Sequence, residues 1–180
     1  MPLSASSPLH AVIDDIASAA ESRDPLQRIK TVLRELTNRF HSSGVLVHEE
    51  EDDELLLHAS QNLTIYHITL SPGLQYPPHN HLMDAVIGLY KGGETNFVYP
   101  VAGGRIEVPE RRDFTAPALL HLPPQTVHSV ANTGSERSGA LHVYLGDLPR
   151  IRRQLWSFQS NQAEPFDNDR YLAGARTIRP

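Results

Sequence analysis

The sequence predicts a mainly β domain, a sandwich or a barrel, that is preceded by α-helices. Apolar residues recur at helical spacing before residue 42, whereas from residue 45 short β-prone runs alternate with Gly, Pro, Asn and Asp. A length of 180 residues, 39% of them hydrophobic and 21% charged, fits one globular domain with a sizeable core. We therefore expect a single domain over 1–180, with a helical segment at 1–44, a β-barrel at 45–147 and a C-terminal wrap at 148–180.

Two helices are predicted in the N-terminal segment. Asp24 and Pro25 are typical of a helix start, because aspartate caps the first turn and proline needs no hydrogen-bond acceptor there. The apolar residues that follow at helical spacing are Leu26, Ile29, Val32, Leu33, Leu36 and Phe40. They predict a helix over about 25–41, and a weaker amphipathic pattern predicts another over about 9–22.

The β-prone runs predict strands at 45–48, 54–59, 63–70, 84–91, 95–101, 105–109, 118–122, 126–131 and 138–145. Gly103-Gly104 predicts a tight hairpin turn between two of these strands, and Gly92-Gly93 predicts a break at a strand end. After Asp147 the chain is rich in arginine and polar residues, so we expect it to wrap the barrel as turns and short helix.

Composition narrows the function classes. A net charge of -5 without a Lys/Arg cluster argues against nucleic-acid binding, and no apolar run approaches the roughly 20 residues of a membrane helix. The N-terminus lacks a basic start followed by an apolar stretch, so we expect no secretory signal and a cytoplasmic location. Since the chain has no cysteine, thiolate ligands, disulfides and a cysteine nucleophile are excluded, and histidine must carry most of the metal chemistry.

Three histidines form the candidate metal site. Residues two apart on a strand point to the same face, so His79 and His81 can offer two imidazoles to one ion, and His128 can supply a third from a neighbouring strand. Imidazole suits iron, zinc, copper and nickel, and three protein ligands leave positions for water, substrate or dioxygen. The alternative is a polar strand face without a metal.

Two motifs give the chain a resemblance to the cupin superfamily. The residues that fit the first cupin motif are Gly73, His79, His81 and Gly93, and those that fit the second are Pro123, His128 and Asn132, with Gln125 where glycine is usual. The resemblance implies a double-stranded β-helix, or jelly-roll, barrel with the N-terminal helices packed on its outside. It also implies one divalent metal ion per chain and, as in many cupins, a homodimer.

A further strand resembles the cysteine-dioxygenase-like cupins. In Ala140-Leu-His142-Val-Tyr144 a histidine and a tyrosine two residues later stand where that group flanks its iron. Together with the metal motifs, this makes the stretch from about 45 to 170 similar to bacterial proteins described as predicted metal-dependent enzymes of the double-stranded β-helix type. The resemblance implies Fe(II), dioxygen and a small thiol or small carboxylic acid as substrate. Tyr144 would hydrogen-bond the bound oxygen or substrate, and His142 would orient its hydroxyl; a merely packed His and Tyr pair is the alternative.

The sequence also departs from the family patterns. Ala85 and Val86 stand where many cupins have a glutamate ligand, so the expected site contains histidines only. Asp84 would face away from them on a continuous strand, and a bulge would be needed for it to coordinate. Without cysteine, the cysteine–tyrosine crosslink of animal cysteine dioxygenases cannot form, and Ala140 replaces the serine of their Ser-His-Tyr relay.

The substrate-binding residue is the least determined part of the site. Residues 60–62 contain no arginine to hold a cysteine carboxylate, but Gln61 resembles the glutamine of bacterial thiol dioxygenases that prefer 3-mercaptopropionate. Other possible carboxylate partners are Arg105, Arg111, Arg112 and Arg137. Two functions from other classes stay open: a cupin that binds a small ligand without turnover, and a zinc- or nickel-dependent enzyme.

Overall fold

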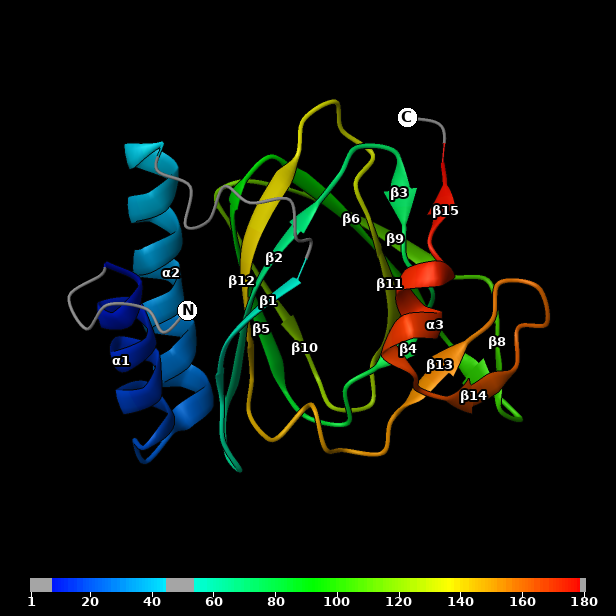
Figure 1. Ribbon diagram of the computed structural model, residues 1–180, viewed down its shortest axis with the longest axis horizontal. Coiled ribbons are helices and arrows are strands. Elements are labelled where there is room, and N and C mark those ends of the chain that lie inside the picture. Colours follow the sequence, from blue (N-terminus) through cyan, green and yellow to red (C-terminus); the bar gives the residue numbers. More distant parts are fainter. Residues whose placement is uncertain (1–7, 45–53, 179–180) are drawn as a thin grey trace.

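The computed structural model describes residues 8–44 and 54–178 and has a mainly β fold with two N-terminal helices, as predicted (Figure 1). Two β-sheets face each other, and the helices cover the outer face of one of them, on the left of Figure 1. The strand predicted at 45–48 lies outside the described residues.

Both predicted helices are present, as α1 (Pro8–Ala20) and α2 (Pro25–Ser43). The Asp24 side chain accepts a hydrogen bond from the Gln27 amide at 3.3 Å, and α2 ends at Gly44 in the left-handed conformation (φ 66°). The inner face of α2 packs closely on the sheet at Gly88, where a Cβ would lie 2.9 Å from Leu33 Cγ. Glycine at this position therefore lets the helix backbone approach the strand.

The first sheet is antiparallel and has the strand order β1-β2-β12-β5-β10. These strands are β1 (Glu54–Ala59), β2 (Thr64–Leu70), β12 (Ser138–Tyr144), β5 (Ala85–Lys91) and β10 (Ala118–Leu122), all close to predicted runs. Its outer face buries a cluster with both helices, and its inner face buries a second cluster that includes Tyr144. Because both faces of the sheet are covered, nearly every residue of β5 and β12 is buried.

The second sheet has the order β14-β13-β4-β11-β3-β15, and β6 joins it by pairing with β11 and β9. Its strands are β3 (Leu74–Gln75), β4 (His79–Asn80), β6 (Gly93–Tyr99), β9 (Glu110–Thr115), β11 (Val127–Ala131), β13 (Gln154–Trp156), β14 (Ala163–Pro165) and β15 (Arg176–Thr177). The short helix α3 (Asn168–Ala173) lies beside this sheet. The segment after Asp147 therefore contributes strands as well as the expected turns and short helix.

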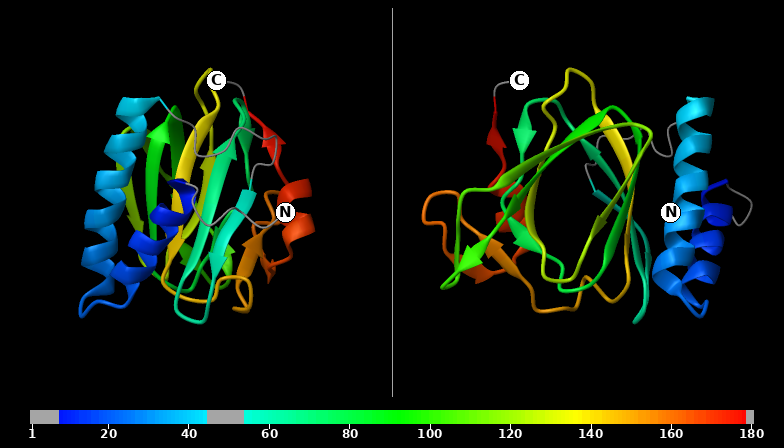
Figure 2. Two further views of the ribbon diagram at one scale, coloured as in Figure 1. Left: turned by 60° about the vertical axis from the view of Figure 1, so that its left-hand side comes forward. Right: turned by 180° about the vertical axis from the view of Figure 1, so that it is seen from behind.

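The expectation of a closed barrel needs correction, because backbone hydrogen bonds do not join the two sheets into one ring in the part of the chain described. The chain instead crosses from one sheet to the other at bends (Figure 2). One bend is Gly92 (φ 69°), where a Cβ would lie 3.0 Å from Ser138 Cα, so the predicted break at Gly92-Gly93 is confirmed. Side chains of both sheets line the space between them, and the architecture is consistent with a cupin.

The strand predicted at 105–109 is shorter than expected. Only β8 (Arg105–Ile106) forms, and it pairs with β7 (Val101–Ala102) through the predicted Gly103-Gly104 turn, where φ is 57° and 77°. Strand β9 was not predicted, because its Glu-Arg-Arg-Asp stretch is charged. It forms because β6 offers a ladder on one side, and its Arg111–Asp113 and Arg112–Glu110 ion pairs stay exposed at the sheet edge.

Glu94, on β6, is a buried carboxyl with little compensation. Its side chain is 2% exposed, Ser138 Oγ donates to Oε1 at a long 3.5 Å, and Oε2 has no partner among the described residues. Burial raises the pKa of Glu94 from 4.5 to about 7, although the Ser138 hydrogen bond lowers it. Between these two pH values the unfolded chain releases a proton that the folded chain retains, so stability falls as pH rises through that window.

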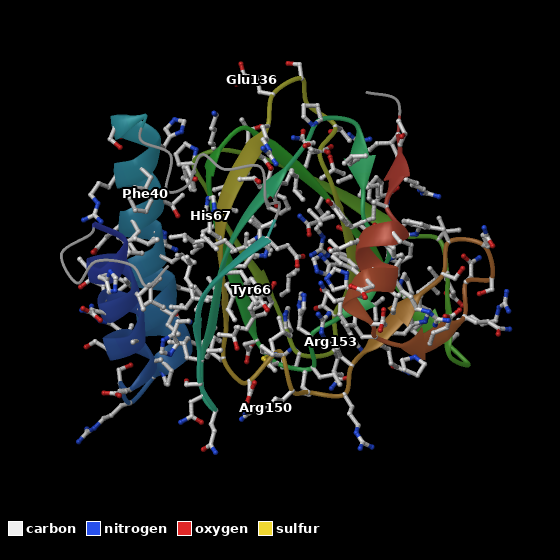
Figure 3. The ribbon with its side chains drawn as sticks, in the orientation of Figure 1. Phe40, Tyr66, His67, Glu136, Arg150 and Arg153 are labelled. Carbon is white, nitrogen blue, oxygen red and sulfur yellow. The ribbon has the colours of Figure 1, made fainter. Side chains whose placement is uncertain are left out.

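Glu94→Gln should therefore flatten the pH dependence of unfolding. Relative to the parent protein, the variant should gain about 3 kcal/mol of unfolding free energy as pH rises through this window, because the neutral amide costs nothing to ionise. Urea denaturation at intervals from pH 4.5 to 7.5 measures the gain. Glu136→Gln, at an exposed loop position at the top of Figure 3, is the matched control. Parallel pH profiles for both variants would contradict this assignment of pKa.

Candidate metal centre

The structure brings the three predicted imidazoles together inside the protein. His128 on β11 pairs across the antiparallel ladder with His79 on β4, and His81 follows directly after β4. Their side chains are 2%, 6% and 3% exposed, respectively, and one nitrogen of each lies within 4.8 Å of the corresponding nitrogens of the other two. The three rings therefore point to a common centre, which is the arrangement that a three-histidine metal site requires.

The local backbone explains how His79 and His81 reach the same point. Strand β4 ends at Asn80, and the chain turns away after His81 through Leu82, which has a φ of 57°. The rings of His79 and His81 meet edge to face, with centroids 5.0 Å apart. The period-two argument from the sequence thus places the pair correctly, although His81 lies beyond the end of the strand.

Hydrogen bonds fix which nitrogen faces the centre in two of the three histidines, His79 and His128. His79 Nδ1 lies 3.0 Å from the Pro77 carbonyl oxygen and donates to it, and His128 Nδ1 donates to Asn96 Oδ1 at 2.8 Å. Both rings then carry their proton on Nδ1 and present the Nε2 lone pair. His128 Nε2 is buried and has no hydrogen-bond partner in the described part of the chain. An unsatisfied buried acceptor is costly, and a metal ion at the centre would satisfy it, so the residues fit the group that the motifs imply.

The electrostatics keep these imidazoles neutral. Burial lowers the pKa of His79 and His81 well below its usual range, and the charges of the neighbouring histidines lower it further. Burial, followed by the charge of Arg153, lowers the pKa of His128 to about 3. At neutral pH all three rings are therefore in the unprotonated form that binds metal ions.

His142 and Tyr144 lie on the inner face of β12 next to the three histidines. The Tyr144 ring meets His81 edge to face at 4.9 Å, and the Tyr144 hydroxyl is 3.2 Å from His142 Nδ1. Burial raises the pKa of Tyr144 above its usual value and lowers the pKa of His142 to about 3, so the phenol stays protonated and the imidazole neutral. The pair thus offers an uncharged hydrogen-bonding hydroxyl to the space beside the metal ligands.

A cavity opens beside the imidazoles. Its volume is about 50 Å³, which corresponds to roughly three to five water molecules. The polar residues of its lining are the three histidines, His142, Tyr144, Tyr66, Glu54, Arg153 and Asn168. Five other lining residues belong to one apolar cluster, the apolar side of the cavity: Ile68, Leu70, Tyr76, Val130 and Tyr171. Leu148 lines the cavity from the cluster of Tyr144. A ligand of this cavity is therefore small and can combine a polar with an apolar part.

Arg153 is a cavity-lining cation that the sequence did not predict. Its guanidinium lies 3.2 Å from the Phe166 ring centroid, and Nη1 donates to the Asn80 carbonyl oxygen at 3.4 Å. Within the described ranges no ion pair joins the Arg153 guanidinium to a carboxylate, although the charge of Glu54, which lines the same cavity, raises the pKa of Arg153. Burial lowers the pKa of Arg153, yet an arginine stays cationic at neutral pH. Figure 3 shows Arg153 and Tyr66 between the sheets, whereas Arg150 lies at the lower surface.

The predicted substrate partners lie elsewhere. Gln61 is exposed in the turn between β1 and β2 and does not line the cavity, so the structure does not bring it to the histidines. The same holds for the four arginines proposed from the sequence. In the sequence Arg153 is one of several neighbouring arginines. It differs from them by its position directly before β13 and by its contact with Phe166, and neither feature can be recognised in a single sequence.

Two further residues have structural roles. Asp84 faces away from the three histidines, as the sequence predicted, and pairs with His121, 2.6 Å from Nε2, although residues 82–83 form a bend rather than a continuous strand. Asn132 closes the turn after β11 with two donated bonds of 2.8 Å, to the carbonyl oxygens of Leu70 and Glu136, and accepts from the Gly134 amide.

None of the described helices has the length and apolar character to span a membrane.

Comparison with known proteins gives partial likenesses. No family model matches the chain. Auxin-binding protein 1 of Arabidopsis thaliana is 30% identical over 81 residues, which are 45% of this chain and 41% of that protein. The chain thus matches about two fifths of the length of this relative. Together with the metal motifs and the two facing sheets, the match supports a cupin-type double-stranded β-helix.

Solved structures with a similar shape include cupins and enzymes. A double-stranded β-helix cupin of Methanocaldococcus jannaschii has a TM-score of 0.46 and 16% identity over 59% of this chain and 93% of its own. Oxalate decarboxylase of Bacillus subtilis has a TM-score of 0.42 and 20% identity over 49% and 22%. DMSP lyase of Ruegeria pomeroyi has a TM-score of 0.42 and 21% identity over 51% and 42%.

Proposed function

We propose that the protein is an iron(II)-dependent oxidoreductase of the thiol dioxygenase type, acting on a small thiol that also carries a carboxylate. The observation that carries this proposal is the grouping, in one small cavity, of three neutral imidazoles, a protonated phenol and a partly buried guanidinium. The three histidines would hold the metal ion and leave several of its coordination positions to ligands from the cavity. When bound, iron(II) would supply the electron transfer by which a thiolate and dioxygen combine to a sulfinate, with both oxygen atoms ending on sulfur.

The chain's own contribution near the ligands comes from Tyr144 and His142. In the tautomer with its proton on Nδ1, His142 would donate to the phenolic oxygen 3.2 Å away, and the hydroxyl proton of Tyr144 would be left to point into the cavity. This proton would donate a hydrogen bond to an anionic atom of the substrate or to oxygen. Because burial holds the pKa of Tyr144 above its usual value, the hydroxyl keeps its proton throughout the neutral range.

Arg153 would hold the substrate carboxylate. Its guanidinium presents a planar, bidentate donor set, which matches the two oxygens of a carboxylate. The Phe166 ring below the guanidinium restricts its plane. Within the described residues the guanidinium donates one hydrogen bond to the protein, to the Asn80 carbonyl oxygen, so its other N–H groups are available to a substrate. A thiol carboxylate would thus be held at both ends. Arg153 takes the role that the sequence had suggested for Gln61.

The experiment that tests the proposal measures oxygen consumption by iron-loaded protein with 3-mercaptopropionate, cysteine and cysteamine. We expect oxygen uptake and an equal amount of sulfinate with at least one thiol carboxylate, and none from zinc-loaded protein, because zinc has no redox chemistry. If zinc-loaded protein turns substrate over and iron-loaded protein never consumes oxygen, the proposal fails in favour of a zinc enzyme; activity found with nickel alone would favour a nickel enzyme.

Tyr144→Phe should keep the metal and slow turnover. The loss of one hydrogen-bond donor to a developing charge lowers kcat by about a hundredfold in comparable sites. Tyr99→Phe is the control, since the Tyr99 hydroxyl bonds Ser129 and does not line the cavity. Steady-state kinetics with metal analysis of both variants measures the effect. Unchanged kinetics in Tyr144→Phe would remove this hydroxyl from the mechanism.

A binding role without turnover is the second candidate. The observation in its favour is the sequence match to a protein named for binding a small ligand, auxin-binding protein 1. The same cavity, with its metal ligands and its guanidinium, would then retain an anion rather than transform it. Bound iron and saturable binding of small acids, with no oxygen uptake from any thiol, would make this role the better account.

A further inference from the structure

The apolar side of the cavity lies next to the metal ligands and is continuous with the core. Ile68 and Leu70 come from β2 of one sheet and Val130 from β11 of the other, two residues beyond His128. All three are at least nine-tenths buried and belong to one apolar cluster with Tyr76 and Tyr171. In the proposed function the thiol and the carboxylate would contact the polar residues, so this apolar surface would be available to a further part of the substrate.

Tyr171 closes the apolar side from outside the two sheets. It is the only buried residue of α3, with 7% of its surface exposed, whereas the next residue, Leu172, is 41% exposed. Its ring stacks on Tyr76 with a centroid distance of 5.2 Å, and meets His79 at 4.9 Å and Phe166 at 5.6 Å. Tyr171 therefore forms the apolar part of the wall that α3 contributes beside the metal ligand His79, and Asn168 is the other residue of α3 that lines the cavity.

We propose that Tyr171 determines the size of the substrate, and that the preferred substrates are thiol carboxylates with a short aliphatic arm lying against Ile68, Leu70 and Val130. The inference rests on the proposed function, because it concerns the occupant of the same cavity. Each methylene buried on this surface strengthens binding about fourfold. Once the arm reaches the Tyr171 ring, the next methylene must displace a packed side chain, and binding weakens.

The experiment uses zinc-loaded protein, which cannot carry out the redox step, and a series of 3-mercaptoalkanoates from propionate to octanoate. Calorimetry under anaerobic conditions gives the affinity for each acid. With the parent protein, affinity should rise about fourfold for each of the first one or two carbons of the arm and then fall. In Tyr171→Ala, affinity should continue to rise for at least two further carbons, because the ring no longer closes the cavity.

Two further variants keep the test decisive. Tyr171→Leu removes less volume and retains an apolar anchor for α3, so it should fold even if Tyr171→Ala does not, and it should shift the length limit by about one carbon. Leu172→Ala, on the exposed side of the same helix, should keep the limit of the parent protein. An unchanged limit in the Tyr171 variants, an equal shift in Leu172→Ala, or no binding of any acid would overturn the inference. A shifted limit without oxygen uptake by iron-loaded protein would instead support the inference and contradict the proposed reaction.

Discussion

His128→Ala should abolish tight metal binding. The substitution leaves His79 and His81 as the two remaining imidazoles of the cluster, and they cannot hold a divalent ion as three ligands do. Loss of a residue that only orients a ligand costs about 10–100-fold in metal affinity, so loss of the ligand itself should cost well over a hundredfold. Metal analysis after dialysis, and titration with iron(II) or zinc, measure the change.

Two variants make this prediction specific. His121→Ala removes a histidine that bonds Asp84 outside the cavity, so it should leave the metal content unchanged. Asn96→Ala removes the acceptor that orients His128, and it should lower metal affinity by about 10–100-fold without abolishing binding. If His128→Ala binds metal as tightly as the parent protein, or if His121→Ala loses it equally, the three-histidine site is wrong.

Arg153→Gln should weaken the use of carboxylate substrates while the metal stays bound. Removing one partner of a buried, charged hydrogen-bonded pair costs about 2 kcal/mol or more, which is about 30-fold or more in kcat/KM for 3-mercaptopropionate. Cysteamine has no carboxylate, so its kcat/KM should change little. The ratio of the two values therefore reports the contact between guanidinium and carboxylate separately from any general damage to the site.

The neighbouring arginine provides the control. Arg152 is exposed, and Arg152→Gln should keep the parent ratio. The metal content of both variants should equal that of the parent protein. The Arg153 guanidinium lies over the Phe166 ring and hydrogen-bonds the Asn80 carbonyl oxygen, so it does not hold a metal ligand in place. If the ratio of kcat/KM for 3-mercaptopropionate to that for cysteamine is unchanged in Arg153→Gln, a group other than Arg153 binds the substrate carboxylate.

Local sequence signals were sufficient for the parts of the fold that depend on neighbouring residues. The cap at Asp24 and the apolar spacing after it located α2, and the paired glycines located the β7–β8 turn. The three histidines were also found, because cupin-like motifs tie them to bends that the structure places around β4 and β11. These features depend on a few residues close in sequence or on a recurrent motif.

Features that depend on long-range packing were not predicted. Arg153 is partly buried because β13 pairs with β4 and β14 leads on to Phe166, contacts that no local pattern encodes. The charged strand β9 forms only because β6 lies beside it. Strand spacing predicted a sandwich or a barrel, and the cupin resemblance implied the barrel; neither carries information on which edges are hydrogen-bonded. The homodimer and the cytoplasmic location, drawn from resemblance and from the N-terminus, remain proposals that sedimentation and cell fractionation would test.

The most direct test of the central claim is the X-ray absorption spectrum at the metal edge of iron-loaded protein. We predict outer-shell scattering from three imidazole rings per iron, together with light-atom ligands at further positions, and a change in the light-atom shell to include sulfur when 3-mercaptopropionate is added without oxygen. An iron spectrum without imidazole scattering, or one that is the same in His128→Ala, would contradict the account.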